Sequence, residues 1–444
     1  MYDAIFIEDR KKPTVTLANE NFLNDAMSAA SSKGMPVVRL VPEPIVSEST
    51  DVEFIEKAVT AAMDSIISSL TRPLTAEEKA PRPRDVENPA RIVFKGNIQE
   101  VNRFFYRRGW TDGLPVIPPT EELVAEMLTG TDLAPDHLVC ELEPRLGKAT
   151  VERIAINAVM AGALPTYLPL LIAATEALNN PRAGMMAAST GSWAPFWVVN
   201  GPVRNDIGVN CSYGAMSPGN IANATIGRTM GLITKNIRGI RQRIEDMGNL
   251  GNPGKYSMVA GENEEASPWE PLHVEHGFKK EDSTITVSFP QTYIQLVPYG
   301  TDYKGVLNSI IYNIPPIRMG TFGVILSQPN AVALASKGWT KQNVKDFVIE
   351  NARAPWERHS NFWASETEAA DKRHPFNPGD SYALFHASPS NPEPVKIYVF
   401  GGIGSWMGLV GGGPPPVTKK AVLPAKWDKL VAKYKDVVPN YIRY

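Results

Sequence analysis

The first 70 residues alternate between strand-like and helix-like patterns of hydrophobic and polar positions. The β-branched runs PTVTLA (13–18) and MPVVRLV (35–41) predict two strands, and the capped segment 19–34 between them predicts a helix. A second helix is predicted over 51–71, and YDAIFIED (2–9) predicts a further strand that starts the same sheet. Because strands and helices alternate, we expect a small parallel α/β unit over residues 1–70.

A longer and more varied pattern follows this unit. Residues 71–92 are polar and rich in proline, which predicts a linker. Residues 93–444 predict a larger, mixed α/β domain with a glycine-rich loop and a C-terminal helix. Helices are expected over 97–110, 121–130, 149–163, 167–180, 217–246, 340–352 and 425–434, and strands over 196–203, 283–290, 292–298, 320–328 and 395–402. The predicted fold class is therefore α/β, with a small parallel N-terminal unit and a larger mixed domain.

Composition and charge narrow the class of protein. Of the 444 residues 43% are hydrophobic and 21% are charged, which is typical of a globular protein. The formal net charge of -2 and the absence of a long basic run argue against nucleic acid as a partner. The N-terminus lacks the pattern of a signal peptide, and no apolar run approaches the roughly 18–20 residues that span a bilayer. We expect a cytoplasmic protein that does not bind membranes.

Two glycine-rich segments suggest nucleotide binding but do not fit its motifs. In GNPGKYS (251–257), Asn249 and Tyr256 occupy positions where a phosphate-binding loop needs Gly and Ser or Thr. Lys255 of this segment is kept as a candidate substrate-binding residue. The segment YVFGGIGSWMGLVGGGPPP (398–416) misses the dinucleotide spacing by one residue, and its triple proline excludes the helix that should follow. We interpret it as a flexible or tightly turned loop, and the sequence identifies no cofactor.

Polar residues at the ends of the strand predicted over 196–203 are candidate ligand-binding groups. Thr190 precedes this strand and Asn200 ends it, and open α/β sheets build their sites at strand ends. Asn210 lies upstream of the long predicted helix, whose free backbone N–H groups could hold an anion, and Arg228 within that helix could supply a cation. The alternative is that the small residues of this region merely permit close packing.

The chain has two cysteines, Cys140 and Cys211, without CxxC spacing or a disulfide framework. This fits a reducing compartment. Cys211 lies just upstream of the long predicted helix, and a helix N-terminus lowers the pKa of a thiol, so a nucleophilic role is one interpretation. A small buried core thiol is the commoner outcome.

The segment AGENEEASPWEPLHVEHGF (260–278) concentrates chemistry. Its carboxylates follow a predicted strand and precede an aromatic residue, a setting in which pKa values are often perturbed. General acid/base groups, ligands for a hard metal and a solvated acidic loop are the three interpretations. Pro268 and Pro271 argue against a helix here, so His273 and His276 are a weak metal pair. We assign no metal ligand, and the candidates taken from this segment are Glu262, Glu264, Glu265, Trp269 and His273.

Four motifs together resemble a known family. They are RGWTDGLPVIPPT, ATVERIAINAVMAGALPTYLPLLIAATEAL, NATIGRTMGLITKN and GNPGKYSMVAGENEEASPWEPLHVEHGF. Over about residues 93–290, and more loosely over the C-terminal part, the chain resembles the large domain of UGSC-family proteins, in which a Cys/selenocysteine-Gly-Ser-Cys motif is joined to a long second domain. Residues 1–70 resemble the later half of the family's small domain, and the motif itself is absent from this chain.

The resemblance implies thiol or selenol chemistry on a small organic substrate. Two explanations of the missing motif follow: a small partner subunit carries Cys-Gly-Ser-Cys, within an oligomer, or this member works without the motif, and we favour the partner subunit. We therefore expect an enzyme subunit that acts on a small polar substrate. Glu262, Glu264, Glu265, His273 and Cys211 are its catalytic candidates, and Thr190, Asn200, Asn210, Arg228, Lys255 and Trp269 are its substrate-binding candidates. A redox-neutral lyase or hydratase, a metal-dependent hydrolase and a non-catalytic scaffold are the alternatives.

Overall fold

The N-terminal unit is a small α/β unit with two parallel strands. The computed structural model describes residues 2–35, 38–44, 52–79, 90–316, 320–355 and 380–437. The N-terminal elements are α1 (Tyr2–Glu8), β1 (Thr16–Asn19), η1 (Glu20–Phe22), α2 (Leu23–Ser32), β2 (Leu40–Glu43) and α3 (Val52–Thr71). Thr16 pairs with Leu40 in parallel register, as the alternation of elements predicts. The strand predicted over 2–9 is wrong, because this segment forms α1 and packs on α2.

The predicted linker contains one short helix in its described part. Helix α4 (Ala76–Lys79) follows α3 after a short turn, and Glu78 of α4 pairs with Arg39, the residue just before β2. Residues 80–89 of the predicted linker lie outside the described residues.

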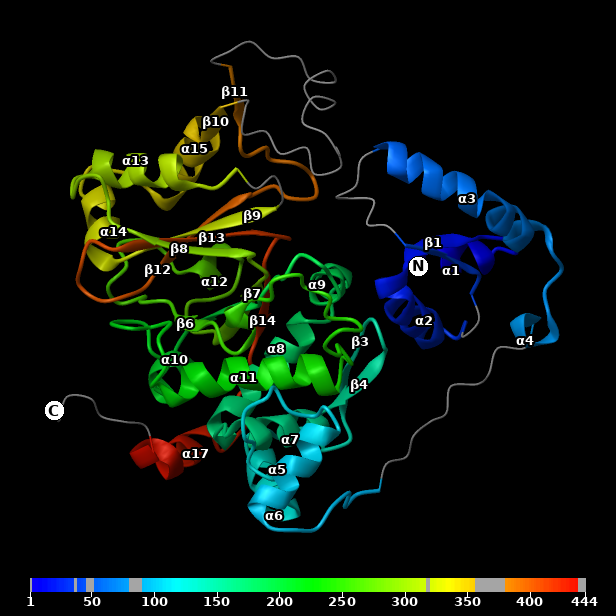
Figure 1. Cartoon of the computed structure of the whole chain (residues 1–444). Helices are drawn as coiled ribbons and strands as arrows, with labels where there is room; N and C mark the ends of the chain where they lie inside the picture. Colours follow the sequence, from blue (N-terminus) through cyan, green and yellow to red (C-terminus); the bar gives the residue numbers. More distant parts are fainter. Residues whose placement is uncertain are drawn as a thin grey trace.

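The large domain stacks two sheets between two layers of helices (Figure 1). One sheet has the strand order β14-β7-β5-β6 and the other the order β12-β9-β13-β8. The strands are β5 (Phe196–Asn200), β6 (Val259–Gly261), β7 (Thr284–Ser288), β8 (Thr292–Leu296), β9 (Thr321–Leu326), β12 (Val395–Val399), β13 (Met407–Gly413) and β14 (Val417–Lys420). Both sheets are mixed, because β5 pairs with β6 and β12 with β9 in parallel while the other pairs are antiparallel.

Helices cover the outer face of each sheet. The first sheet is covered by α7 (Val151–Ala161), α8 (Leu168–Ala177) and α11 (Ile221–Asn236), and the second by α13 (Tyr303–Asn313), α14 (Gln328–Ala335) and α15 (Lys341–Asn351). The remaining described elements are α5 (Ile98–Arg107), α6 (Glu121–Leu128), β3 (Leu138–Leu142), β4 (Gly147–Thr150), η3 (Pro165–Tyr167), α9 (Pro181–Ala187), α10 (Val203–Asp206), η4 (Pro253–Lys255), α12 (Leu272–Glu275), β10 (Arg353–Pro355), β11 (Ser381–Ala383), α17 (Trp427–Tyr434) and η6 (Lys435–Val437). None of the helices in the described ranges is long and apolar enough to cross a membrane.

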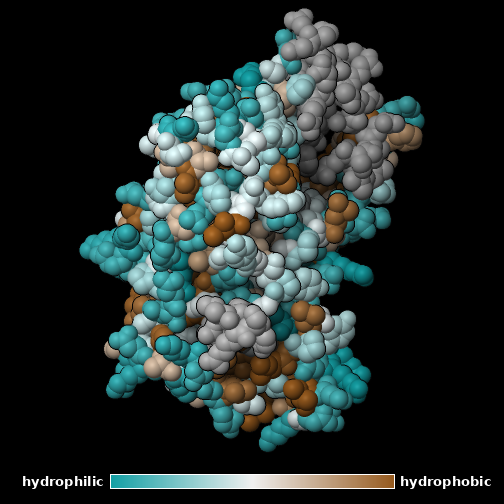
Figure 2. Space-filling model, turned by 90° about the vertical axis from the view of Figure 1, so that its left-hand side faces the viewer, coloured by the Kyte–Doolittle hydropathy of each residue, from teal (hydrophilic) through white to brown (hydrophobic). Residues whose placement is uncertain are grey.

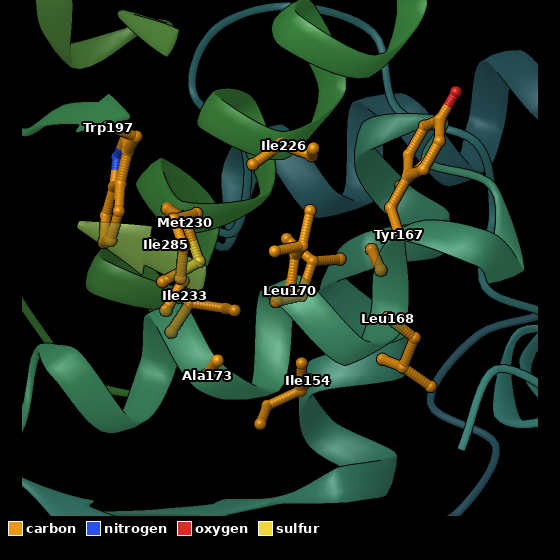
Figure 3. Packing of buried hydrophobic residues seen from close by; sticks show 14 of the residues in the cluster. Ile154, Tyr167, Leu168, Leu170, Ala173, Trp197, Ile226, Met230, Ile233 and Ile285 are labelled. Carbon is orange, nitrogen blue, oxygen red and sulfur yellow. The ribbon is translucent and has the colours of Figure 1, made fainter. Parts of the chain in front are cut away.

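The side chains of β5 show how the layers are held together. Trp197 and Val199 face the helices of the first sheet, where they join the core that contains Leu170, Ile226 and Met230 (Figure 3). Phe196 and Val198 face the other way and pack between the sheets against residues of β9, β12 and β13. Since both faces of β5 are covered, all five of its residues are buried, as its continuous apolar run predicts.

Two predicted elements of the large domain differ from the structure. The second half of the glycine-rich segment is not a loop, because β13 lies between β8 and β9 in the second sheet. The helix predicted over 217–246 is shorter, because α11 begins after the capping residue Asn220 and ends at Asn236. Gly239 then adopts a positive φ of 81°, which turns the chain away from the helix.

Candidate functional site

Loops from three strand ends meet at one edge of the two sheets. β5 and β6 are parallel, so their carboxyl ends lie side by side, and Asn263 just after β6 donates a backbone hydrogen bond to the carbonyl of Val399 at the end of β12 (2.7 Å). The loop after α10 joins this edge, because the backbone N–H of Gly401 donates to the carbonyl of Cys211 (2.9 Å). The edge therefore combines segments that are far apart in the sequence. We call it the strand-end site.

Glu262 occupies the centre of the strand-end site and is completely buried. Its Oε2 accepts hydrogen bonds from Asn200 Nδ2 and from the backbone N–H of Leu272, both at 2.7 Å. Its Oε1 lies 3.5 Å from Lys341 Nζ and 3.4 Å from the backbone N–H of Val399. Because each oxygen has two partners, this carboxylate ties β5, β6, β12 and α15 together.

A chain of buried charges continues from Glu262 along α15. Lys341 Nζ also lies 2.8 Å from Glu275 Oε2, and Lys345 Nζ lies 3.0 Å from Glu275 Oε1. Burial alone would lower the pKa of Lys341, but the charges of Glu262 and Glu275 outweigh it and raise this pKa. Both lysines are thus paired with carboxylates from the segment 260–278.

Glu264 is clamped by donors at the end of β5. Its Oε1 accepts from the backbone N–H of Gly201 (2.7 Å), from Asn200 Nδ2 (3.1 Å) and from Arg204 Nε (3.1 Å). The side chain of Arg204 is only 2% exposed, so a buried guanidinium stands against this carboxylate. Charge-assisted hydrogen bonds of this kind are short and strong, so they fix the positions of both side chains.

Glu265 is the carboxylate of the cluster that faces solvent. Its side chain is 60% exposed, while its Oε1 accepts from Arg204 Nη2 (2.9 Å) and Asn205 Nδ2 (3.0 Å). Partial burial would raise the pKa of Glu265, but the hydrogen bonds from Arg204 and Asn205 outweigh it and lower the pKa to about 2. Glu265 is therefore a carboxylate at neutral pH.

Cys211 is in contact with the same guanidinium. Its Sγ lies 3.8 Å from Arg204 Nη1, and the residue is partly exposed. Burial raises the pKa of Cys211, and the charge of Arg204 opposes this rise without cancelling it. The prediction of a thiol pKa lowered by a helix N-terminus is wrong, because α11 begins only at Ile221.

The two histidines of the segment 260–278 are structural in their contacts. The prediction that the prolines prevent a helix is wrong, since Pro271 serves as the N-cap of α12, where a proline is tolerated. His273 is completely buried, and its Nε2 lies 3.3 Å from the carbonyl of Lys280. His276 Nδ1 lies 2.6 Å from Thr418 Oγ1, and burial together with Lys396 lowers the pKa of His276 to about 4.

Three predicted substrate-binding residues make their polar contacts away from the strand-end site. Arg228 forms a bidentate ion pair with Asp112 (2.8 and 3.0 Å), which fastens the turn after α5 to α11. Lys255 pairs with Asp246 at 2.7 Å, and the carbonyl of Thr190 accepts from the backbone N–H of Asn249. These contacts hold loops in place, and none of them reaches Glu262 or Glu264.

Asn200, Asn210 and Trp269 lie at or beside the strand-end site. Asn200 is completely buried, donates to both Glu262 and Glu264, and its Oδ1 has no hydrogen-bond partner within the described ranges. Asn210 shapes the Cys211 loop, because its side chain contacts the backbone of Ser212 and Tyr213. Trp269 Nε1 donates to the carbonyl of Trp339 (3.0 Å) and so connects the segment 260–278 to the second sheet's helices.

Sequence reasoning missed two cations of this site. Arg204 follows β5 within GPVRND, and its position just after a buried strand was the available signal. Lys341 lies at the start of α15, 79 residues from Glu262, and nothing local to it indicates the pairing. The segment 260–278 contains five glutamates and no lysine or arginine. In the structure, the charges of Glu262, Glu264 and Glu265 are compensated by Arg204 and Lys341.

The part of the chain that the structure describes contains no group of three or more His, Cys, Asp or Glu side chains placed to hold a metal ion. Figure 2 shows the face that lies at the left of Figure 1, where single hydrophobic residues are scattered among hydrophilic ones over most of the surface.

Comparisons with known protein families, curated proteins and solved structures found no match.

Proposed function

We propose that the chain is an enzyme, or the subunit of one, that acts on a small polar organic substrate at the strand-end site. The observation that carries this proposal is the convergence of Glu264, Glu265 and Cys211 on the buried guanidinium of Arg204. Two carboxylates, a thiol and a guanidinium meet at the carboxyl ends of parallel strands. This combination of negative, neutral and positive groups is suited to substrate binding and proton transfer.

The geometry favours different roles for the three carboxylates. Glu262 is saturated with partners inside the protein, so its role is to hold the loops. Glu265 faces solvent beside Arg204 and is the carboxylate that a substrate can reach. Because the thiol of Cys211 is protonated at neutral pH, its addition to a carbonyl carbon would pass its proton to the Glu265 carboxylate as the S–C bond forms, while the π electron pair of the C=O bond moves to the carbonyl oxygen.

The resemblance to UGSC-family proteins adds a partner subunit with Cys-Gly-Ser-Cys to this proposal. Support comes from the N-terminal unit, which leaves large apolar side chains uncovered on α1, α2 and α3. Phe6, Met27, Phe54 and Ile67 are each more than half exposed. Such a surface is typical of a docking face. Affinity purification of a tagged chain from its native host, followed by mass spectrometry, tests for a small cysteine-containing subunit, and its repeated absence would remove this part of the proposal.

A non-catalytic scaffold is the second candidate. It is favoured by the saturation of Glu262 and by the internal partners of Glu264, since carboxylates fully engaged in the fold are not free for chemistry. A redox-neutral lyase or hydratase acting without a partner thiol would use the same groups as the first proposal.

Substrate consumption in a metabolite extract separates these candidates. The purified chain is incubated with the extract, and small molecules are followed by mass spectrometry for the wild type, for Glu265→Gln and Cys211→Ser, and for Lys255→Gln as a control away from the site. We expect consumption to be lost in E265Q, reduced in C211S and unchanged in K255Q, with circular dichroism confirming that all variants fold. Equal consumption by the wild type and E265Q would contradict catalysis at this site and favour the scaffold.

A further inference from the structure

An open cavity of about 350 Å³ lies on the outer surface of the second helix layer. Its walls come from Lys337–Trp339, just after α14, and from one face of α15. On that face Asn343, Asp346, Phe347 and Glu350 follow each other at the spacing of helical neighbours, while Lys341 and Lys345 occupy the buried face. The cavity is thus separate from the strand-end site, although the same helix serves both.

Two aromatic rings line the cavity. The rings of Trp339 and Phe347 lie 5.6 Å apart at 88°, so one ring presents its edge to the other. Both residues are only partly buried, and each therefore leaves aromatic surface toward the cavity. The faces of Trp and Phe rings carry negative electrostatic potential and attract cations.

Carboxylates stand beside these rings. Asp346 and Glu350 are exposed, lie one helical turn apart and line the same cavity. Lys337 on the opposite wall is the one cation among the lining side chains, so the formal charge of the lining is negative. An anion would meet two carboxylates here, and a neutral apolar ligand would gain nothing from them.

We propose that this cavity binds a small organic cation, with an ammonium group placed against Trp339 and Phe347 and its charge balanced by Asp346 and Glu350. The cavity volume suits a ligand of the size of an alkylammonium ion rather than an extended polymer. The proposal goes beyond the proposed function and does not depend on it.

Two contacts join the walls of this cavity to the strand-end site. Trp269 of the segment 260–278 donates its indole N–H to the carbonyl of Trp339 (3.0 Å). On the buried face of α15, Lys341 contacts Glu262 and Glu275. A cation in the cavity is therefore one helix away from the carboxylates of the strand-end site.

Isothermal titration calorimetry with choline and with its neutral isostere 3,3-dimethylbutan-1-ol tests the proposal. We expect choline to bind with millimolar affinity and the alcohol to bind roughly tenfold more weakly, because the isostere keeps the shape and loses the charge. Raising the salt concentration from about 20 mM to about 0.5 M should weaken choline binding, since the carboxylates are exposed.

Variants assign the binding to this cavity. D346N combined with E350Q should weaken choline binding several-fold, K337Q should strengthen it, and E281Q, at an exposed acid outside the cavity, should leave it unchanged. W339L should reduce the difference between choline and the alcohol, because Phe347, Asp346 and Glu350 remain. The proposal is overturned if choline does not bind, if the neutral alcohol binds equally well, or if the double variant binds choline as the wild type does.

Discussion

At the scale of single residues, the carboxylates of the segment 260–278 differ in their burial and in their ion-pair partners. Glu262 is buried against Lys341, whereas Glu265 is exposed beside Arg204. Removing one member of a buried pair leaves the other charge without compensation, while an exposed pair is screened by water. Position within the fold, rather than residue type, therefore decides what each carboxylate contributes.

Glu262→Gln should destabilise the protein by about 2 kcal/mol, because the hydrogen bonds from Asn200 and Leu272 lose a charged buried acceptor, while Lys341 keeps Glu275 as a counter-charge. Glu265→Gln is the matched control and should cost less than about 1 kcal/mol. Urea unfolding followed by circular dichroism measures both changes. Equal losses for the two variants would show that Glu262 does not hold the sheets together.

The two thiols should react with iodoacetamide at different pH values. Burial raises the pKa of Cys140 to about 11, and it raises that of Cys211 against the opposing charge of Arg204. Both thiols should therefore react slowly at neutral pH, and Cys211, which is partly exposed, should react first as the pH rises. Arg204→Met should move the reactivity of Cys211 to still higher pH, because the cation that favours its thiolate is gone. Peptide mass spectrometry at a series of pH values measures both rates, and an unchanged profile in the variant would exclude this coupling.

The candidate carboxylates could be selected from the sequence, but their partners could not. Glu262, Glu264 and Glu265 stand out as an acidic run between a strand and an aromatic residue. Arg204 and Lys341 lie 60 and 79 residues away from their carboxylates in the chain, so only the packing of three strand ends brings them together. For the same reason the sequence does not show that Arg228 pairs with Asp112, which is 116 residues away.

At the scale of elements, β13 shows why a glycine-rich strand escapes prediction. Glycine is disfavoured in strands, so the run GGG indicates a loop. In the structure a Cβ at Gly411 would lie 2.1 Å from the Phe322 ring, and one at Gly413 would lie 2.3 Å from the carbonyl oxygen of Phe289. Both positions require glycine, because neighbouring groups lie too close to the backbone for a Cβ atom.

Gly413→Ala should therefore destabilise the protein by roughly 2 kcal/mol, because the added methyl group would press on a backbone carbonyl that cannot rotate away. Gly404→Ala, in the loop before the same strand, is the control, since a Cβ there meets nothing within 4 Å. Thermal unfolding compares the two variants. An unaffected melting temperature for G413A would mean that β13 does not pack against Phe289 as described.

At the scale of the whole molecule, the pattern predicts the α/β class and the parallel N-terminal pair, but not the stacking of two sheets. The alternation of strands and helices is a local property, whereas the stacking depends on which face of each strand meets the other sheet. Val198 of β5 and Tyr398 of β12 share the core between the sheets, although 200 residues separate them. The sequence shows that Val198 and Tyr398 are apolar or aromatic, but it does not show that they pack in the same core.

The N-terminal unit contacts the large domain through a cluster of charges around α2. Ser28 Oγ donates to Glu245 Oε1 (2.6 Å), Arg241 Nη2 contacts Ser28 Oγ (2.9 Å), and Lys33 pairs with Glu143 (2.7 Å). Asp25 on the same helix lies near Glu245. Burial, and then the charge of Glu245, raise the pKa of Asp25 to about 6.

This shift makes the docking of α2 depend on pH. Glu245 of the large domain is one cause of the rise of the Asp25 pKa from its ordinary value of 3.8 to about 6, so ionisation of Asp25 opposes docking. The penalty is absent below the lower value, grows as the pH rises between the two, and is fully present above about 6. The pKa of Glu245 is lowered, so Glu245 is ionised at both pH 5 and pH 8 and does not affect the comparison between them.

Asp25→Asn should therefore strengthen the docking of α2 by about 1 kcal/mol at pH 8, once solvent screening of this half-buried group is allowed for, and by much less at pH 5. Hydrogen–deuterium exchange of the amides of residues 23–32, corrected for the intrinsic rate at each pH, measures the docking. Asp64→Asn on the exposed side of α3 is the control and should leave this exchange unchanged. If the wild type protects α2 equally at both pH values, Asp25 does not report the contact between the N-terminal unit and the large domain.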